Sequence, residues 1–325
     1  MKAVLCKSFG PPDSLVIEDV APLNAGAGEV VIDVKACGVN FPDTLIIQGK
    51  YQFRPTMPFS PGGEVAGIVK SIGEGVTNVA VGDAVIAFTG WGGFAEEAKC
   101  FALQVMPMPP DTPFPLAASF VLTYGTSYHA LKDRANLQPG ETLLVLGAAG
   151  GVGLAACEIG KAMGARVIAA ASSDNKLAIC KQHGADETIN YSNGNLREQI
   201  DALVGRRGVD VVIDPVGGAY TEPAFRAMAW KGRHLVIGFA AGDIPKISIN
   251  LTLLKGASIM GVFWGSFVKN EPMIHTKNMQ ELMALLKQRK LNPLISATYP
   301  LARAADALND LMQRRAVGKI VLVTS

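Results

Sequence analysis

The chain has 325 residues, of which 49% are hydrophobic and 18% are charged, and its formal net charge is +2. A chain of this length is longer than one that typically folds around a single hydrophobic core, so two domains are favoured. The small net charge excludes the strongly basic surface of a nucleic-acid-binding protein or of one drawn to an anionic membrane. The opening MKAVLCKSFG lacks an apolar signal-peptide core, and no stretch approaches about 18 uninterrupted apolar residues. We therefore expect a cytoplasmic protein without a membrane span.

The cysteine pattern argues against both a disulfide framework and a cysteine-rich zinc site. The five cysteines are odd in number, scattered, and never form a C-x-x-C pair, which suits a reducing compartment. They are Cys6, Cys37, Cys100, Cys157 and Cys180.

The first hundred residues predict a β-rich domain. Short alternating or apolar runs recur between Gly, Pro, Asn and Asp clusters, a spacing typical of a compact, partly open β-barrel. These runs are Ala3–Cys6, Leu15–Val20, Glu29–Gly38, Glu64–Ile72, Ala84–Phe88 and Phe94–Cys100. A proline-rich stretch, Met106–Pro115, follows and is the expected joint between domains.

From about Leu116 the pattern changes to strands that alternate with helices. Continuously apolar strands separated by helices are typical of a doubly wound parallel sheet buried on both faces. The predicted strands are Leu143–Leu146, Arg166–Ala170, Val209–Ile213, His234–Ile237 and Ser258–Phe263. The predicted helices are Val152–Met163, Asp174–His183, Leu196–Val204 and Thr221–Met228.

The C-terminal segment is expected to return to the first domain. It carries the predicted helices Lys277–Lys290 and Ala302–Gln313 and ends with the strand Lys319–Val323. We therefore predict an α/β protein with a β-barrel domain at 1–117 and 265–325 and a dinucleotide-binding domain at 118–264.

The segment TLLVLGAAGGVG, at 142–153, predicts a dinucleotide site. An apolar strand leads into a glycine-rich turn and then a helix, and the second strand, Arg166–Ala170, ends 17 residues after Gly153. Glycines let the backbone approach a pyrophosphate, to which the helix N-terminus offers N–H groups and partial positive charge. The candidate cofactor contacts here are Gly147, Ala149, Gly150, Gly151 and Val152.

The end of the second strand favours NADPH over NADH. An NAD site normally places a carboxylate there, but the strand ends in alanines and continues with Ser172, Ser173 and Lys176. The two hydroxyls and the ammonium are suited to a 2′-phosphate, and each charge-assisted bond contributes roughly 1.5–3 kcal/mol. The alternative is that Lys176 is a solvated residue of the next helix, whose N-terminus Asp174 caps.

With these residues in view, the whole chain resembles the medium-chain dehydrogenase/reductase superfamily, and most closely its zinc-free quinone oxidoreductase branch (ζ-crystallin-like). The resemblance implies a GroES-like catalytic domain and a Rossmann domain. It rests on motifs in the family order: Cys37–Asp43 (CGVNFPD), Pro61–Gly67 (PGGEVAG), Val81–Asp83 (VGD), Leu122–Thr126 (LTYGT), the glycine turn and Gly318–Leu322 (GKIVL).

The chain departs from its zinc-dependent relatives at the metal ligands. Where those relatives carry G-H-E, this sequence has Gly62-Gly63-Glu64, and near their first cysteine ligand it has Asn40. Cys100 is the only cysteine among residues 88–102, so a four-cysteine structural site cannot form. The four histidines are expected on helix surfaces or at strand ends, and we predict no metal. They are His129, His183, His234 and His275.

The resemblance implies that Asn40 and Tyr51 carry the catalytic site. Asn40 would lie beside the nicotinamide, where its amide bonds the cofactor or orients an acceptor carbonyl; the alternative is local turn chemistry. Tyr51 matches a tyrosine that is proposed to be a proton donor in zinc-free 2-enoyl thioester reductases. In quinone reductases the matching tyrosine is a cofactor contact. The alternative is an interfacial tyrosine whose hydroxyl is solvated. Asp43 is expected to be a structural capping or pairing residue.

The resemblance also implies further cofactor contacts. Thr126 matches a position on the nicotinamide side, and Tyr191 matches one near the adenosine phosphate. Either Arg314 or Arg315 would meet the 2′-phosphate. The remaining predicted contacts follow two strands: Gly238, Phe239, Ala240, Phe263 and Trp264.

Without a metal to polarise an alcohol, the expected reaction is hydride transfer from NADPH to an activated acceptor, a quinone or an α,β-unsaturated carbonyl compound. Two alternatives remain: a 2-enoyl thioester (enoyl-CoA) reductase, or a redox sensor that binds NADPH without turnover. The resemblance also implies a homodimer, in which the Ser258–Phe263 strand would be a sheet edge that pairs with its mate.

Overall fold

The computed structural model describes residues 1–324 and divides the chain into two compact units. Unit 1 comprises Met1–Leu122 and Pro293–Ser325, and unit 2 comprises Thr123–Asn292. The α/β fold class is as predicted. The two units divide at 122/123 and 292/293, and the sequence-based domain boundaries were 117/118 and 264/265.

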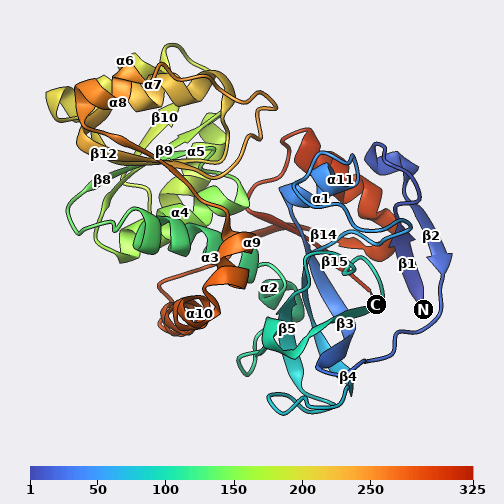
Figure 1. The fold of residues 1–325 in the computed structure, drawn as a ribbon. Coiled ribbons are helices and arrows are strands. Elements are labelled where there is room, and N and C mark those ends of the chain that lie inside the picture. The colour runs from blue at the N-terminus through green and yellow to red at the C-terminus, as the bar shows by residue number, and fades with distance from the viewer. Residues whose placement is uncertain (325) are drawn as a thin grey trace. The chain divides into compact units, whose positions relative to one another are not determined.

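Unit 1 is built on a seven-stranded, mostly antiparallel sheet with strand order β14-β15-β3-β4-β5-β7, from which β6 branches off β3 (Figure 1). Its long central strand β3 pairs along one edge with β4, while the other edge is shared by β6 and β15. The parallel pair β14–β15 comes from the C-terminal segment. The described elements are β1 Lys2–Leu5, β2 Val16–Asp19, β3 Glu29–Val39, α1 Phe41–Ile46, β4 Glu64–Ile72, β5 Ala84–Phe88, β6 Glu97–Phe101, β7 Val105–Pro107, α2 Phe114–Ala117, β14 Ile295–Pro300, α11 Ala304–Met312 and β15 Lys319–Val323.

Unit 2 is a six-stranded, all-parallel sheet with strand order β10-β9-β8-β11-β12-β13. Helices α6, α7 and α8 cover one face and α4 the other (Figure 1). The described elements are α3 Val121–Tyr128 (which begins in unit 1), β8 Thr142–Leu146, α4 Gly151–Ala162, β9 Arg166–Ala171, α5 Asp174–Gln182, β10 Glu187–Asn190, α6 Leu196–Val204, β11 Val209–Asp214, α7 Thr221–Arg226, β12 Met228–Val236, α8 Asn250–Lys255, β13 Ser258–Gly261, α9 Trp264–Asn270 and α10 Pro272–Lys287.

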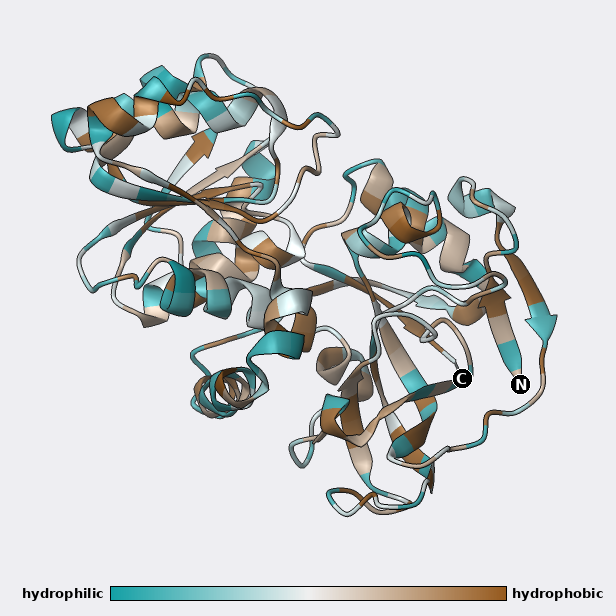
Figure 2. Ribbon diagram, viewed as in Figure 1, coloured by the Kyte–Doolittle hydropathy of each residue, from teal (hydrophilic) through white to brown (hydrophobic). Residues whose placement is uncertain are grey.

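The parallel strands of unit 2 are apolar because helices cover both of their faces. Every residue of β8 is buried, and Figure 2 shows hydrophobic colouring along this sheet. The side chains of Ile200 in α6 and Phe225 in α7 are fully buried in the core cluster that also contains Leu144 and Ile168 of the sheet. This packing fixes the carboxyl ends of the strands, where nucleotide sheets bind their ligands.

Helices α9 and α10 stay with unit 2 because their side chains pack against α3 and the turn of π-helix that follows it. The ring of Trp264 lies so close to Gly125 that a Cβ there would come within 2.8 Å of it. The amide of Asn278 donates to Asp133 at 2.6 Å. These contacts join α9 and α10 to the rest of unit 2.

Candidate functional site

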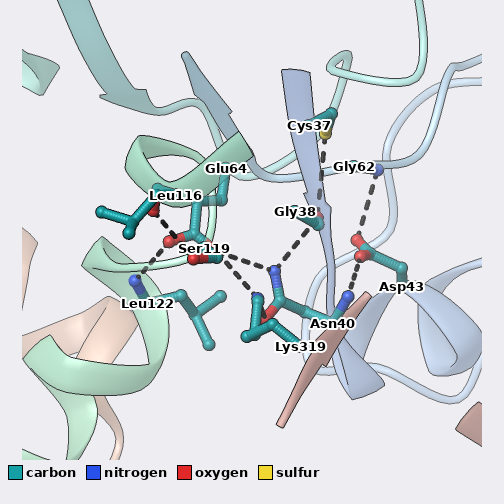
Figure 3. Close-up of polar contacts among 10 residues, drawn as sticks. All are labelled: Cys37, Gly38, Asn40, Asp43, Gly62, Glu64, Leu116, Ser119, Leu122 and Lys319. Atoms are coloured by element: carbon teal, nitrogen blue, oxygen red, sulfur yellow. Dashed lines mark hydrogen bonds and ion pairs between the residues drawn. The ribbon is translucent and has the colours of Figure 1, made fainter. Parts of the chain in front are cut away.

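A buried polar cluster in unit 1 is formed where three strand ends meet. Asn40 follows β3, Glu64 begins β4 and Lys319 begins β15. The strand register places Gly38 opposite Glu64 and Val39 opposite Ile320, so the three side chains converge. Each is at most 5% exposed. We call these three residues the Asn40–Glu64–Lys319 cluster (Figure 3).

The hydrogen bonds of the cluster satisfy its buried charges. The Lys319 ammonium donates to Asn40 Oδ1 at 2.5 Å and to Glu64 Oε2 at 3.0 Å. Glu64 also accepts the amide of Asn40 at 3.1 Å and the backbone N–H of Leu122 at 2.9 Å. A buried charge needs such partners, since an unpaired one costs several kcal/mol.

The side chain of Asn40 takes part in this cluster and also bonds the local backbone at Gly38. Its amide nitrogen donates to Gly38 O at 3.2 Å and to Glu64, while Oδ1 accepts from Lys319. The amide hydrogens and one lone pair of Oδ1 are therefore engaged, and one lone pair of Oδ1 remains. This geometry limits Asn40 to the role of a hydrogen-bond acceptor toward any further group.

Gly38 is required because the cluster lies directly on its α-carbon. A Cβ at this position would come within 2.1 Å of the carbonyl oxygen of Ala118 and 2.8 Å of Glu64 Oε2. The carbonyl of Ala118 cannot move away without displacing the backbone that precedes α3. The glycine in the motif CGVN thus has a packing role.

Asp43 organises the loop beside the cluster, as the sequence predicted for a capping residue. Its two carboxylate oxygens accept the backbone N–H groups of Asn40, at 2.7 Å, and Gly62, at 3.2 Å (Figure 3). Burial raises the pKa of Asp43 from 3.8 to about 7, although both N–H groups and Lys319 favour the ionised form. Desolvation outweighs these contacts because the side chain is 4% exposed.

We expect Asp43 to make folding stability depend on pH between about 4 and about 7. The folded-state pKa lies above the unfolded value, so the folded protein holds the proton more tightly, and the free energy of unfolding falls as pH rises through this window. The contribution amounts to roughly 1.4 kcal/mol per pH unit, a few kcal/mol in total. Denaturant unfolding of Asp43→Asn at pH 5 and pH 7.5 should lack this decline; a decline equal to that of the parent protein would contradict the assignment.

Tyr51 lies half-buried in unit 1, and its ring meets that of Phe53 edge-on at 4.9 Å. Burial and, secondarily, the charge of Asp43 raise the pKa of the Tyr51 phenol, so it stays protonated at neutral pH. Among the described residues the structure gives its hydroxyl no hydrogen-bond partner. The phenol is thus a proton-bearing group available to a ligand.

The predicted glycine turn connects β8 to α4 in unit 2. Gly147 has φ of 59°, in the left-handed region that favours glycine, and a Cβ on Gly153 would come within 2.4 Å of the Gly147 carbonyl oxygen. Gly150 is exposed, and Gly151, Val152 and Gly153 form the first turn of the twelve-residue helix, whose N–H groups lack intrahelical partners. The turn therefore fits an approaching diphosphate.

The residues after β9 lie at the same edge of the sheet. Ser173 caps α5, its hydroxyl accepting from the backbone N–H of Lys176 at 3.5 Å. The alternative that Asp174 caps this helix is wrong, because its carboxylate instead accepts the amide of Asn190 at 2.8 Å. Ser172 is exposed, and Lys176, four residues later, is half-buried.

Asp214, which ends β11, is a residue of this edge that the sequence reading missed. It is 2% exposed and accepts the N–H groups of Val216 and Gly217, at 2.9 and 2.8 Å, and the hydroxyl of Thr221 at 2.6 Å. Burial alone would raise the pKa of Asp214, but these bonds and one from His234 hold it below its ordinary value. The carboxylate thereby fixes the loop whose Val216 packs against the glycine turn.

The other predicted cofactor residues of unit 2 occupy varied environments. Thr126 and Trp264 are buried, whereas Phe263 is 47% exposed. The rings of Tyr191 and Tyr220 lie 4.5 Å apart. The segment of Gly238, Phe239 and Ala240 follows β12, and Ala240 donates its N–H to the carbonyl of Pro215 at 3.1 Å. Ala149 is buried within the turn.

The two candidate arginines follow α11 in unit 1 and differ in their contacts. Arg315 donates to Asp310 through Nε at 2.8 Å, and Asp310 also accepts the hydroxyl of Tyr299 at 2.5 Å. Arg314 has φ of 58°, an unusual backbone conformation for a residue with a side chain. The guanidinium of Arg315 is thus already bound to a carboxylate.

A second buried polar cluster, in unit 2, was also not predicted from the sequence. Glu158 of α4 is 6% exposed and accepts the hydroxyl of Tyr124 at 2.7 Å, Nδ1 of His183 at 2.5 Å and the backbone N–H of Asn292 at 2.9 Å. These bonds tie α3, α4 and the end of α5 together. The cluster holds in place the helix that carries Thr126.

The histidines were expected on helix surfaces or at strand ends, but three of the four are buried beside carboxylates. His129 is paired with Asp133 at 2.8 Å, His183 with Glu158, and His234 with Asp214 at 3.2 Å. Burial lowers the pKa of His275 to about 4.

Within residues 1–324 no group of three or more metal-ligating side chains is close enough to hold an ion. In the same part of the chain, no helix is both long and apolar enough to cross a bilayer.

Comparison with known proteins adds two family matches. Residues 26–110 match the family model described as alcohol dehydrogenase GroES-like domain, and residues 151–288 match the model described as zinc-binding dehydrogenase.

Relatives match over the full length of the chain. The chain is 38% identical to rat quinone oxidoreductase-like protein 2, covering 99% of this chain and 91% of the relative. It is 35% identical to rat quinone oxidoreductase, covering 99% and 98%. The crystal structure of Escherichia coli quinone oxidoreductase complexed with NADPH superimposes with a TM-score of 0.94 at 27% identity, covering both chains completely.

Proposed function

Because the chain belongs to the quinone oxidoreductase branch of the medium-chain dehydrogenase/reductase superfamily, we propose that it is an NADPH-dependent reductase of quinones or α,β-unsaturated carbonyl compounds. The observation that carries the cofactor assignment is the glycine turn at the N-terminus of α4, next to Ser172 and Lys176. It is supported by the NADPH complex of the Escherichia coli relative.

The residues of the turn fit the cofactor by their chemistry. Gly150 is exposed and a Cβ there would meet only Gly147 O, at 3.4 Å, while the N–H groups of the first turn of α4 would face an anion bound at this turn. No carboxylate ends β9, and the Ser172 hydroxyl and the Lys176 ammonium are suited to a 2′-phosphate. Lys176 would supply the charge that distinguishes NADPH from NADH.

When bound, NADPH supplies a hydride, and the acceptor takes up this hydride and one proton to give a hydroquinone or a saturated carbonyl compound. Tyr51 is proposed to hydrogen-bond the acceptor and to hold that proton, since its phenol is protonated and available. Asn40 is proposed to accept one hydrogen bond from the cofactor through the remaining lone pair of Oδ1. The Lys319 ammonium fixes the orientation of this amide.

We further propose that the reaction needs no metal ion. The support is chemical: Gly63 stands where zinc-dependent relatives carry a histidine, and an amide, Asn40, lies near the position of a thiolate. A conjugated acceptor is already electrophilic and does not require a Lewis acid to take a hydride.

The function is tested by following NADPH oxidation at 340 nm with 1,4-benzoquinone, methyl vinyl ketone and crotonyl-CoA as acceptors. NADH and a chelator serve as controls. We expect turnover of the quinone or the enone, preference for NADPH and no effect of the chelator. Turnover of crotonyl-CoA alone would favour the 2-enoyl thioester reductase, and tight NADPH binding without turnover would favour the redox sensor.

A homodimer in a reducing, cytoplasmic compartment is also proposed. Strand β13 is an edge of the six-stranded sheet, and Ile259 within it is 44% exposed, so its free backbone groups can pair with a second copy. The five cysteines are free and buried, which suits reducing conditions. Light scattering that gave the mass of a single chain would contradict the dimer.

A further inference from the structure

Three aromatic side chains of unit 1 lie close to one another, and the cofactor site does not explain them. Phe53 lies between the other two, 4.9 Å from the ring of Tyr51 and 5.6 Å from that of Trp91. Tyr51 and Phe53 are half-buried, whereas Trp91 is 45% exposed. We call these three residues the aromatic shelf.

The backbone next to Trp91 is held by hydrogen bonds to a neighbouring loop. The flanking Gly90 and Gly92 have φ of 80° and 96°, and the N–H of Gly92 donates to the carbonyl of Ser60 at 2.8 Å. The next residue, Gly93, donates to Gly62 O at 2.8 Å. The turn therefore presents an exposed indole on a backbone that is bonded to a neighbouring loop.

The same loop links the shelf to the polar residues described above. The N–H of Gly62 donates to Asp43, and the charge of Asp43 acts on Tyr51. The shelf thus offers an apolar, π-rich face at one end and, at the other, a phenol whose hydroxyl has no partner among residues 1–324. An exposed aromatic face costs free energy in water unless a ligand covers it.

A flat conjugated ring that carries a carbonyl oxygen matches both ends of this surface. Its ring stacks on an aromatic face, and an electron-poor ring does so best because the faces of Trp and Phe are electron-rich. Its carbonyl accepts a hydrogen bond from the Tyr51 hydroxyl. A small aliphatic enone offers only the second interaction.

From this arrangement we infer that the aromatic shelf selects fused-ring quinones over small aliphatic enones, with Trp91 as the residue that determines this specificity. The inference rests on the proposed function and names the acceptor class within it. Trp91 contributes to the binding of the ring, while Tyr51 binds the carbonyl of either acceptor. The preference therefore concerns KM more than kcat.

The test compares 1,4-naphthoquinone with methyl vinyl ketone at saturating NADPH. We expect Trp91→Ala to lower kcat/KM for the naphthoquinone about five- to tenfold, through KM, and to change kcat/KM for methyl vinyl ketone less than about twofold. Trp91→Phe should retain at least about half of the naphthoquinone activity. Phe101→Ala is the matched control, since Phe101 is an aromatic residue of unit 1 that is 60% exposed and lies outside the shelf.

Equal losses for both acceptors, or no loss for the naphthoquinone, would overturn the inference. A binding measurement separates it from the proposed function. Equilibrium dialysis with 2,3-dimethyl-1,4-naphthoquinone, which has no quinone-ring hydrogen for a thiol to displace, should show a Kd about fivefold higher for Trp91→Ala and unchanged for Phe101→Ala. If the parent protein reduced neither acceptor, the proposed function would fail, and an unchanged Kd for Trp91→Ala would remain the result that overturns the inference.

Discussion

Replacing Lys319 with methionine is expected to lower the free energy of unfolding by about 3–5 kcal/mol, the largest loss that we predict for any single side chain of unit 1. The substitution keeps the apolar stem but removes the ammonium between Asn40 and Glu64. Glu64, which is fully buried, would keep only the N–H groups of Leu122 and Asn40. Denaturant unfolding measures the change as a lower midpoint.

Two further variants make this prediction specific. The double variant Lys319→Met with Glu64→Gln should recover much of the loss, because a neutral amide no longer needs the cation. Lys99→Met is the matched control: it removes a lysine that pairs with Glu29 at 2.9 Å at the surface, where an ion pair contributes less than about 1 kcal/mol. Equal effects of Lys319→Met and Lys99→Met would contradict a buried, structurally required charge.

The parallel sheet of unit 2 could be predicted from the sequence because the residue patterns that indicate it are local. Continuous apolar runs identified β8, β9 and β11, and the helix predicted at Leu196–Val204 has the same bounds in the structure. Glycines directly after β8 marked the turn into α4. Burial on both faces produces such runs wherever the strand lies in the chain, so no long-range information is needed.

The Asn40–Glu64–Lys319 cluster could not be predicted because its members are distant in the sequence. Glu64 and Lys319 are separated by 255 positions, and each follows glycine in a motif that gives no sign of burial. Only the pairing of β3 with both β4 and β15 brings them together. Two of the buried histidines were not recognised for the same reason, since the acidic partner of His183 is 25 positions away and that of His234 is 20 positions away.

The strands β10 and β14 were missed for a different reason. The residues of β14 alternate between half-buried and exposed, and β10, an edge of its sheet, has four residues of which only Ile189 is buried. Weak burial leaves a weak hydrophobic pattern. The fold class was predicted correctly despite these omissions, because the central strands of each sheet have the strongest hydrophobic patterns.

Replacing Gly150 with alanine is expected to weaken NADPH binding roughly tenfold or more while leaving the fold intact. Gly150 has φ of −77° and ψ of 170°, a conformation that alanine adopts freely, and its Cβ would come no closer than 3.4 Å to Gly147 O. The unfolded chain loses entropy, so the thermal midpoint should stay equal or rise slightly. The added methyl group, however, would occupy the space through which a pyrophosphate approaches the backbone.

Gly153→Ala provides the contrasting case, because its Cβ would lie 2.4 Å from Gly147 O and 2.6 Å from the α-carbon of Ala148. This variant should lose stability as well as NADPH affinity, since the backbone of the turn must move. Fluorescence titration with NADPH and thermal unfolding, measured on both variants, separate the two effects. If Gly150→Ala bound NADPH as tightly as the parent protein, no phosphate group would approach this turn, and the cofactor assignment would have to be abandoned even though the fold is that of a dinucleotide-binding sheet.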